Sequence, residues 1–331
     1  MKKPSKNYFQ LGIIHPMAYP ETGKGEGPVV ETFTAIAKDE FFDAIEFRRH
    51  DHNPAIREQL KKIVVESGIT PVIAGQPPLL GAKLNLNALD EPARVAAVAD
   101  VKKSVDEAYY MGARILAILS GPMPASPEEV VKAKDALVKS VVEICNYAKE
   151  KKTGYVLTVS LETFDFDIDK KCLIGPTVEA VEFAKIVRKM VDNFGLTLDL
   201  SHLPLLRETS KHALKTAKDY LVHVHIGNCI MKDTKQVGYG DQHPRFGISG
   251  GENGVNELYE FLKQLKDIGY FDKRPAGMLP IISFEVKPLA GESSELVIAN
   301  AKRALLAAWD FKSKHEDDEN KKHKDKKKHK H

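Results

Sequence analysis

Eight short apolar stretches recur along the 331-residue chain, and longer stretches of mixed character separate them. Each short stretch is rich in Ile, Val and Leu and is bounded by Gly, Pro or polar residues. This composition is typical of strands in a parallel sheet that is buried on both faces. We expect strands at residues 9–15, 44–48, 70–76, 113–121, 155–162, 195–202, 221–228 and 279–287.

The segments between these strands repeat apolar residues every three or four positions, which predicts amphipathic helices. Ser126, followed by Pro127, is a typical helix start, because the serine caps the first turn and the proline fits it. Glycines placed to end helices in a left-handed conformation are Gly68, Gly112, Gly195 and Gly269. The expected helices span residues 28–40, 54–67, 91–111, 127–152, 176–194, 208–221, 255–268 and 293–311.

Eight strands, each followed by a helix or by a loop and a helix, match the count of a closed (β/α)8 barrel. The competing α/β fold, a doubly wound open sheet, favours a Gly-rich phosphate-binding sequence after its first strand. Residues 15–27 read HPMAYPETGKGEG and contain no GxGxxG. We therefore predict an α/β fold with one TIM barrel catalytic domain over residues 1–311 and a charged, disordered Lys/His-rich tail over residues 312–331.

Charge is spread unevenly along the chain. The tail holds nine Lys against five acidic residues, whereas the rest holds 40 basic and 41 acidic residues. A nearly neutral body gives no general electrostatic case for nucleic-acid binding. The tail has too little apolar surface to bury, so we expect it to be solvated.

Cysteine usage and hydropathy set the expected compartment. The three cysteines form no CxxC pair, which suits a reducing environment. The apolar run near the N-terminus is broken early by Pro16, so it does not read as a secretory signal. No run approaches the roughly 20 apolar residues of a membrane span. We expect a cytoplasmic protein without a membrane partner.

Four consecutive predicted strands carry a metal-binding type of side chain at or near their C-terminal ends: Glu162, Asp199, His225 and Glu285. Active sites of TIM barrels lie at these ends, and adjacent strands are about 4.8 Å apart, so the four side chains can converge on one ion. Any one of them alone is as well explained by a helix cap or a salt bridge. Carboxylates with one imidazole suit a divalent metal such as Mn²⁺, which we favour, or Co²⁺ or Mg²⁺.

The segments SLETFD, LDLSH, VHVHIGN and FEVKP, which contain these residues, resemble segments of the xylose-isomerase-like TIM barrel superfamily. This superfamily groups sugar isomerases and epimerases, including ketose 3-epimerases, with the more distant endonuclease IV. The resemblance extends over residues 9–310. It implies that the four strand-end residues bind one divalent metal and that His202, three residues after Asp199, binds the substrate.

Two positions depart from the ketose 3-epimerase pattern. A second Glu is expected six residues after Glu162, where this chain has Ile168, and an Arg is expected at Met231. The acidic residues that could replace the missing Glu are Asp165, Asp167 and Asp169. Arg245 is available to replace the missing Arg.

Further pocket candidates follow from position. The long loop 228–253 leaves the barrel directly after the metal-type strand end, and we expect a lid in which His243 or Arg245 grips the substrate. Lys287 shares a face with Glu285, where substrate contact and solvent exposure are equally open. His15, Gln76 and Ser120 end other strands and are weaker candidates.

Three residues of the barrel interior have structural alternatives. Glu46 and Arg48 share one face of their strand, where an internal pair and a substrate contact are equally open. His223 lies one layer deeper than His225, so we expect a hydrogen-bonded core histidine rather than a ligand.

The ligand set and the resemblance imply a metal-dependent sugar isomerase or epimerase. A proton next to a carbonyl would be abstracted through a metal-bound enediolate, with Glu162 and Glu285 as acid and base. One alternative is a lyase on 3-keto glycosides, resembling the large subunit of C-glycoside-cleaving enzymes, which has a small partner subunit. Another is a sugar-binding barrel without activity. We expect a small carbohydrate as ligand and a homo-oligomer.

Overall fold

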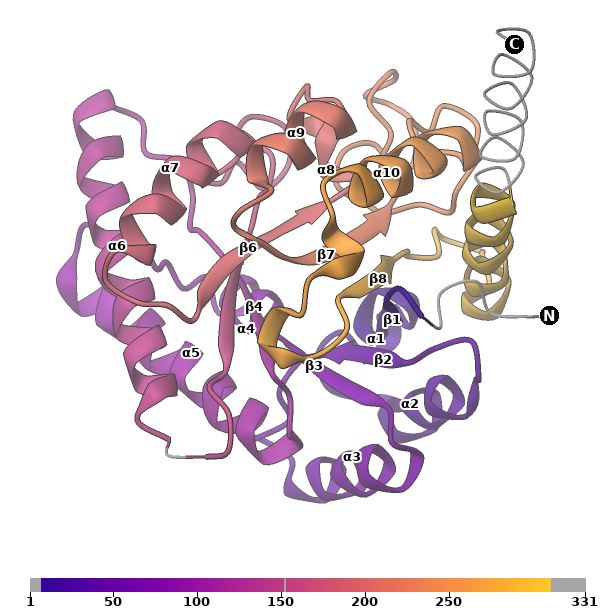
Figure 1. The fold of residues 1–331 in the computed structure, drawn as a ribbon, viewed down its shortest axis with the longest axis horizontal. Coiled ribbons are helices and arrows are strands. Elements are labelled where there is room, and N and C mark those ends of the chain that lie inside the picture. Colours follow the sequence, from indigo (N-terminus) through magenta and orange to yellow (C-terminus); the bar gives the residue numbers. More distant parts are fainter. Residues whose placement is uncertain (1–6, 152, 311–331) are drawn as a thin grey trace, which may run out of the picture.

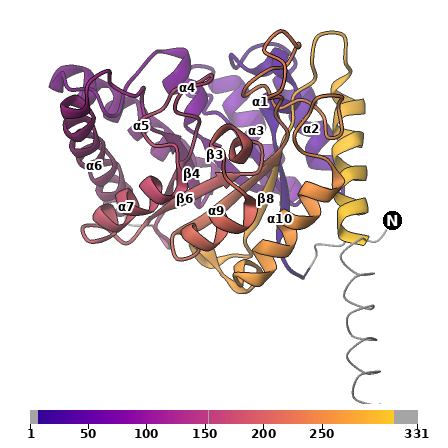
Figure 2. The same ribbon diagram turned by 90° about the horizontal axis from the view of Figure 1, so that it is seen from above.

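The structure is a computed structural model that describes residues 7–151 and 153–310. Eight parallel strands form a closed barrel in sequence order, and helices surround it (Figures 1 and 2). The strands are β1 (Gln10–Ile14), β2 (Ala44–Phe47), β3 (Thr70–Ala74), β4 (Ile115–Leu119), β5 (Thr158–Glu162), β6 (Phe194–Asp199), β7 (Leu221–Gly227) and β8 (Ile281–Glu285). The predicted TIM barrel is therefore confirmed. The predicted tail, residues 312–331, lies outside the described residues.

The outer helices begin close to where the hydrophobic pattern predicts. They are α2 (Val29–Lys38), α3 (Pro54–Ser67), α5 (Glu91–Met111), α6 (Pro127–Lys149), α7 (Thr177–Arg188), α9 (Ser210–Ala217), α10 (Val255–Asp267) and a last helix over residues 294–310. Two of them, α7 and α9, end six and four residues before the predicted ends. Ser126 caps α6 as expected, its Oγ accepting the Glu129 N–H at 3.2 Å. Gly68 and Gly112 end α3 and α5 with φ of 71° and 83°.

The predicted helix end at Gly195 is wrong. Helix α7 already ends at Arg188, and Gly195 lies within β6, paired in register with Ser160 of β5. A Cβ at Gly195 would lie 2.4 Å from Val222 Cγ1 of the neighbouring strand β7. The glycine is therefore required by the close approach of the next strand and not by a left-handed turn.

Three short helices begin within three residues of the end of a strand. The hydrophobic pattern did not predict them. They are α1 (His15–Ala18), α4 (Gln76–Gly81) and α8 (His202–Leu205). Three 3-10 turns complete the structure: η1 (Pro20–Thr22), η2 (Tyr270–Asp272) and η3 (Pro275–Gly277). A single helical turn has too few residues for a 3.6-residue period to be recognised.

The two ends of the described chain meet beside the barrel. The ring of Trp309, in the last helix, lies 5.7 Å from the ring of Phe9, which immediately precedes β1. Phe271 stacks on the same phenylalanine at 5.6 Å. These aromatic contacts fasten the last helix over the junction of β8 and β1.

The three cysteines are free and buried. Burial raises the thiol pKa of Cys145 and of Cys172 to about 12 in each case, and it also raises the pKa of Cys229. In the described part of the chain, no helix has both the length and the apolar character needed to cross a membrane.

Candidate active site

Strand register brings the four predicted metal ligands together at the C-terminal end of the barrel. Glu162, Asp199 and Glu285 are the last residues of β5, β6 and β8, and Asp199 is the register partner of His225 on β7. All four side chains are buried, and one potential ligand atom from each lies within 4.8 Å of the others. The sequence prediction of one convergent cluster agrees with this geometry.

Two of the glutamates, Glu162 and Glu285, approach the same nitrogen of the His225 imidazole. Its Nδ1 is 3.0 Å from Glu162 Oε1 and 2.9 Å from Glu285 Oε2. Glu285 Oε2 is buried and has no aligned hydrogen-bond donor among the described residues. Asp199 Oδ1 accepts the Ser201 N–H at 2.8 Å, which fixes the direction of that carboxylate. The metal-type atoms thus face one another across a small space.

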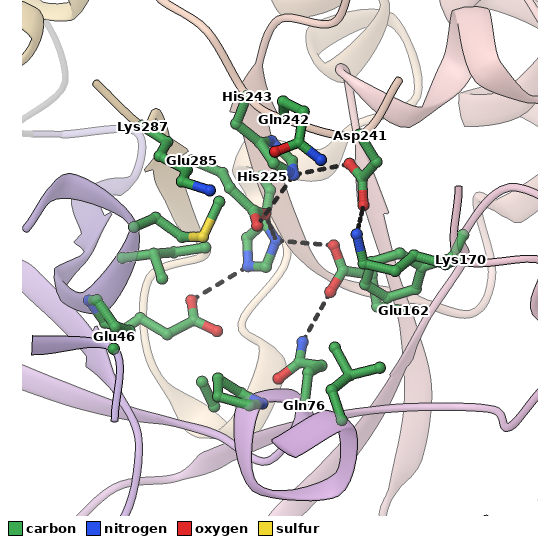
Figure 3. A pocket seen from close by; sticks show the side chains of 18 residues that line it. Glu46, Gln76, Glu162, Lys170, His225, Asp241, Gln242, His243, Glu285 and Lys287 are labelled. Carbon is green, nitrogen blue, oxygen red and sulfur yellow. Dashed lines mark hydrogen bonds and ion pairs between the residues drawn. The ribbon is translucent and has the colours of Figure 1, made fainter. Parts of the chain in front are cut away.

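Glu46 lies on the other side of the same imidazole, as Figure 3 shows. Its Oε2 is 3.1 Å from His225 Nε2 and 3.0 Å from His223 Nε2. The predicted alternative of a Glu46–Arg48 pair is not formed, because Arg48 donates instead to the Gly23 carbonyl at 2.7 Å. His223 is buried as expected, but its Nδ1 has no partner among the described residues.

A second polar cluster adjoins the first and is centred on Asp241. Asp241 Oδ1 lies 3.0 Å from His202 Nε2 and 2.8 Å from His243 Nε2, and its Oδ2 accepts from Lys170 Nζ at 2.8 Å. His202 Nδ1 donates to the Thr163 carbonyl at 2.8 Å. Because a carbonyl can only accept, His202 Nδ1 carries a proton, and the Asp241 carboxylate beside Nε2 favours a second proton there.

Burial and charge act in opposite directions on these groups. Burial alone would lower the pKa of His202, but Asp241 and Asp199 raise it well above its usual value. Burial likewise lowers the pKa of His225, and Glu46 and Glu162 outweigh it, so that pKa is also raised.

Burial and nearby charge also act in opposite directions on the pKa values of two carboxyl groups. The pKa of Asp199 is raised, mainly by burial. The pKa of Asp241 lies well below its usual value because His202, His243 and Lys170 outweigh burial. The carboxylates of this cluster therefore create a field that favours positive charge.

The residues present fit a bound divalent cation. The cluster contains five carboxyl groups, Glu46, Glu162, Asp199, Asp241 and Glu285, together with Lys170 and the imidazoles of His202, His225 and His243. Buried carboxylates without a compensating positive charge are costly. Glu285 Oε2, which has no aligned hydrogen-bond donor among the described residues, and the mixed oxygen and nitrogen donors match a hard or borderline divalent ion. Glu162, Asp199, His225 and Glu285 would hold it.

A cavity of about 260 Å³ opens beside this cluster. Figure 3 shows Lys170 next to Asp241 on one side and Lys287 next to Glu285 on the other. Apolar side chains, among them Met17 and Phe164, form other parts of the wall. The cavity combines hydrogen-bonding groups with apolar surface, as a small polar ligand with C–H faces requires.

The other sequence candidates divide into those at the cavity and those away from it. His243, Lys287 and Gln76 line it, and Gln76 Nε2 donates to Glu162 Oε2 at 2.7 Å. His202 does not line the cavity and contacts Asp241, which does. Arg245 does not line the cavity either, and its Nε is 2.9 Å from Glu292 Oε1. His15 and Ser120 also lie outside it; they bond Thr32 Oγ1 and the Ile174 N–H.

None of the three acidic candidates for the missing second Glu lines the cavity. Asp165 accepts backbone N–H groups of residues 168–171, Asp167 pairs with Arg207, and Asp169 accepts the Asp241 N–H. Lys170 occupies the cavity wall instead, and the sequence analysis missed it. The only local signal in the sequence was Asp165. Its carboxylate accepts backbone N–H groups of the following residues and so turns the chain back towards the barrel.

The predicted loop over residues 228–253 is present and is anchored at both ends. Asn228 Oδ1 accepts the Asn253 N–H at 2.7 Å, and Asn253 Nδ2 donates to the carbonyls of Leu200 and Gly227 at 3.1 Å each. His243 sits in this loop with a φ of 49°, a left-handed conformation that is rare for a residue other than glycine. Strained backbone of this kind is common at functional sites.

The sequence profile of the xylose isomerase-like TIM barrel family matches residues 34–279. The chain belongs to this family. The match extends from within α2 to the approach to β8, so it includes three of the four candidate ligands. No curated protein matches the chain.

Solved structures share the family fold at low sequence identity. An L-ribulose 3-epimerase is 17% identical with a TM-score of 0.67, covering 92% of this chain and 97% of its own. The 3-keto-D-glucoside 4-epimerase of E. coli is 14% identical with a TM-score of 0.63, covering 89% and 98%. The IolI protein, whose structure contains a zinc atom, is 16% identical with a TM-score of 0.66, covering 91% and 98%. At these identities the similarity establishes the fold.

Proposed function

We propose that this protein is a divalent-metal-dependent isomerase or epimerase of a small carbohydrate. One observation carries the proposal: four side chains from four consecutive strands place their ligand atoms within 4.8 Å of one another beside a cavity of about 260 Å³. The names of the structural relatives, which include a ketose epimerase and a keto-glucoside epimerase, support a carbohydrate substrate. We favour Mn²⁺, with Co²⁺ or Mg²⁺ as alternatives.

A bound divalent ion would acidify the C–H bond next to a carbonyl and stabilise the negative charge left when that proton departs. The chain would supply the proton transfers through Glu162 and Glu285. These carboxylates stand on two sides of His225 Nδ1, at 3.0 Å and 2.9 Å. One can remove the proton from the carbon next to the carbonyl, and the other can return a proton either to the opposite face of that carbon, which gives epimerisation, or to the former carbonyl carbon, which gives isomerisation.

Other cavity residues would orient the substrate. His243 and Lys287 are placed to contact hydroxyl or carbonyl oxygens, and the backbone bond from the Lys287 N–H to the His243 carbonyl, 2.7 Å, holds them near each other. His202 would act on the substrate indirectly, through its contact with Asp241. A contact from Arg245 requires the loop to move, because its guanidinium is paired with Glu292 in this conformation.

Metal analysis tests the first half of the proposal. The purified protein should bind one divalent ion per chain, and the double variant Asp199→Ala with His225→Ala should bind none. A matched control removes the exposed residues His212 and Asp272 in the same way, and its metal content should equal that of the original protein. Metal retained by the Asp199/His225 variant would refute the assignment.

A solvent-exchange screen tests the second half. The metal-loaded protein would be incubated in D₂O with ketoses, aldoses and 3-keto glycosides, and deuterium incorporation next to the carbonyl would be measured by NMR. We expect incorporation into at least one class together with an isomer or epimer. Metal binding without exchange in any class would favour the sugar-binding barrel without activity.

One observation supports the lyase alternative. None of Asp165, Asp167 and Asp169 lines the cavity in place of the glutamate expected at Ile168, and Lys170 lines it in that region. Elimination from a 3-keto glycoside needs one base and a proton donor for the departing oxygen, so it does not require that glutamate. The same screen separates the two reactions, because elimination releases the aglycone and leaves an unsaturated sugar.

A further inference from the structure

The carboxyl group of Glu46 is fully buried beside two histidines. Its exposed fraction is 0%, and its ion-pair partners among the described residues are His223 and His225. The nearest arginine in sequence, Arg48, donates instead to the Gly23 carbonyl. A buried carboxylate needs hydrogen-bond donors close to it. The two imidazoles are placed to donate, and both reach the same oxygen, Oε2.

The two nitrogens of His225 face different groups. Nε2 is 3.1 Å from Glu46 Oε2, whereas Nδ1 faces the candidate ligands Glu162 and Glu285. A neutral imidazole carries one proton. If that proton is on Nε2 and is donated to Glu46, the lone pair of Nδ1 points at the place where the ligand atoms converge.

We propose that Glu46 is a positioning residue of the metal centre: it holds the Nε2–H of His225, so that this histidine binds the ion through Nδ1. The inference rests on the proposed function, since it requires that the site binds an ion. Carboxylates that accept a hydrogen bond from a metal-bound histidine fix its orientation and raise its basicity.

His223 completes the arrangement by fixing Glu46. Its Nε2 lies 3.0 Å from the same Oε2 atom, and its ring stands at 88° to that of His225 with centroids 4.8 Å apart. Two imidazoles therefore hold one carboxylate oxygen from two directions. His223 therefore orients Glu46 in addition to packing in the core.

The competing arrangement is a second cation bound by Glu46, His223 and His225, whose potential ligand atoms also lie within 4.8 Å of one another. In that case the Nε2 of His225 would be a ligand and would carry no proton. The two arrangements therefore predict opposite nitrogens of the same residue.

Histidine nitrogen NMR tests the inference on the unmodified protein. The chain would be labelled with ¹⁵N-histidine and loaded with one equivalent of Zn²⁺, which is diamagnetic. We expect the His225 signals, assigned by comparison with His225→Gln, to show a metal-bound Nδ1 and a protonated Nε2. A metal-bound Nε2 would overturn the inference.

Metal affinity provides the second readout. Glu46→Gln is expected to weaken Co²⁺ and Mn²⁺ binding about 10- to 100-fold, measured by calorimetry. The matched control is Glu107→Gln on α5. Glu107 is another buried glutamate, but it does not line the cavity, and its Oε2 lies 2.6 Å from Arg57 Nε. The metal affinity of this control variant should stay within twofold of that of the original protein. Equal affinity of Glu46→Gln and the original protein would refute the positioning role.

The two proposals can fail separately. If the original protein binds no divalent ion, the proposed function and this inference both fall. If it binds an ion but Glu46→Gln binds it equally well, only the inference falls. Should Glu46→Gln not fold, the NMR assignment of the unmodified protein decides alone.

Discussion

The carboxylate of Asp241 and the ammonium of Lys170 lie 2.8 Å apart, and this ion pair joins the loop after β5 to the loop after β7 at the cavity. Asp241 is almost fully buried, whereas the Lys170 side chain is 24% exposed. The pair is thus buried on its acidic side and partly hydrated on its basic side.

Replacing Lys170 with Met should lower the free energy of unfolding by about 1–3 kcal/mol. The variant removes one of the three partners of Asp241. Because His202 and His243 remain and the lysine is partly hydrated, the cost lies below that of breaking a fully buried pair. The double variant Lys170→Met with Asp241→Asn should lose less than the sum of the two single variants, measured by urea unfolding. Additive losses would show that the two residues are not coupled.

Glu162→Gln and Glu285→Gln should each abolish deuterium exchange next to the substrate carbonyl, because an amide cannot take up the proton. Both residues end a strand at the cavity and add little to the apolar core, so the far-ultraviolet circular dichroism should be unchanged. NMR of the exchange reaction with excess metal checks the result. A variant that retains exchange loses its assigned acid–base role.

Asn253→Ala should lower the free energy of unfolding by about 2–4 kcal/mol, because it leaves the buried carbonyls of Leu200 and Gly227 without their donor. The matched control is Asn256→Ala, an exposed asparagine three residues later, which should change stability by less than about 0.5 kcal/mol. Chemical denaturation measures both. A small effect at Asn253 would mean that other contacts anchor the loop.

Gly195→Ala should destabilise the barrel by about 1–3 kcal/mol, because its Cβ would meet Val222 Cγ1 at 2.4 Å and the Tyr220 carbonyl oxygen at 2.8 Å. Gly81→Ala is the control: nothing lies within 4 Å of its Cβ, and it ends the helix α4. Its stability should be equal or slightly higher. A fully tolerated alanine at Gly195 would show that β6 and β7 can separate locally.

Much of the barrel could be predicted from the sequence because buried parallel strands are apolar throughout and the side chains at their ends are polar. Glu162, Asp199 and Glu285 each close such a stretch, so one rule finds all three. The rule assigns positions along a strand and carries no information about which residues face one another across the barrel.

The rest depended on contacts between distant parts of the chain. Glu46 meets His223 and His225, which follow it by 177 and 179 residues, so the local pairing with Arg48 was the nearest alternative in sequence. Lys170 reaches the cavity only because the Asp165 turn folds its loop inward. Gly195 occupies a helix-ending position by sequence, but in the structure the side chain of Val222 leaves no room for a Cβ there.

The buried cysteines provide unlabelled reporters of local opening. Cys145 lies in α6, Cys172 in the loop after β5 and Cys229 in the loop after β7, and each thiol is held in its unreactive protonated form by burial. Alkylation therefore requires that the surrounding segment first exposes its thiol. Mass spectrometry of timed alkylation would read the opening of the two cavity loops separately from that of the outer helix layer, and a bound ion or sugar should slow the reaction of Cys172 and Cys229 more than that of Cys145.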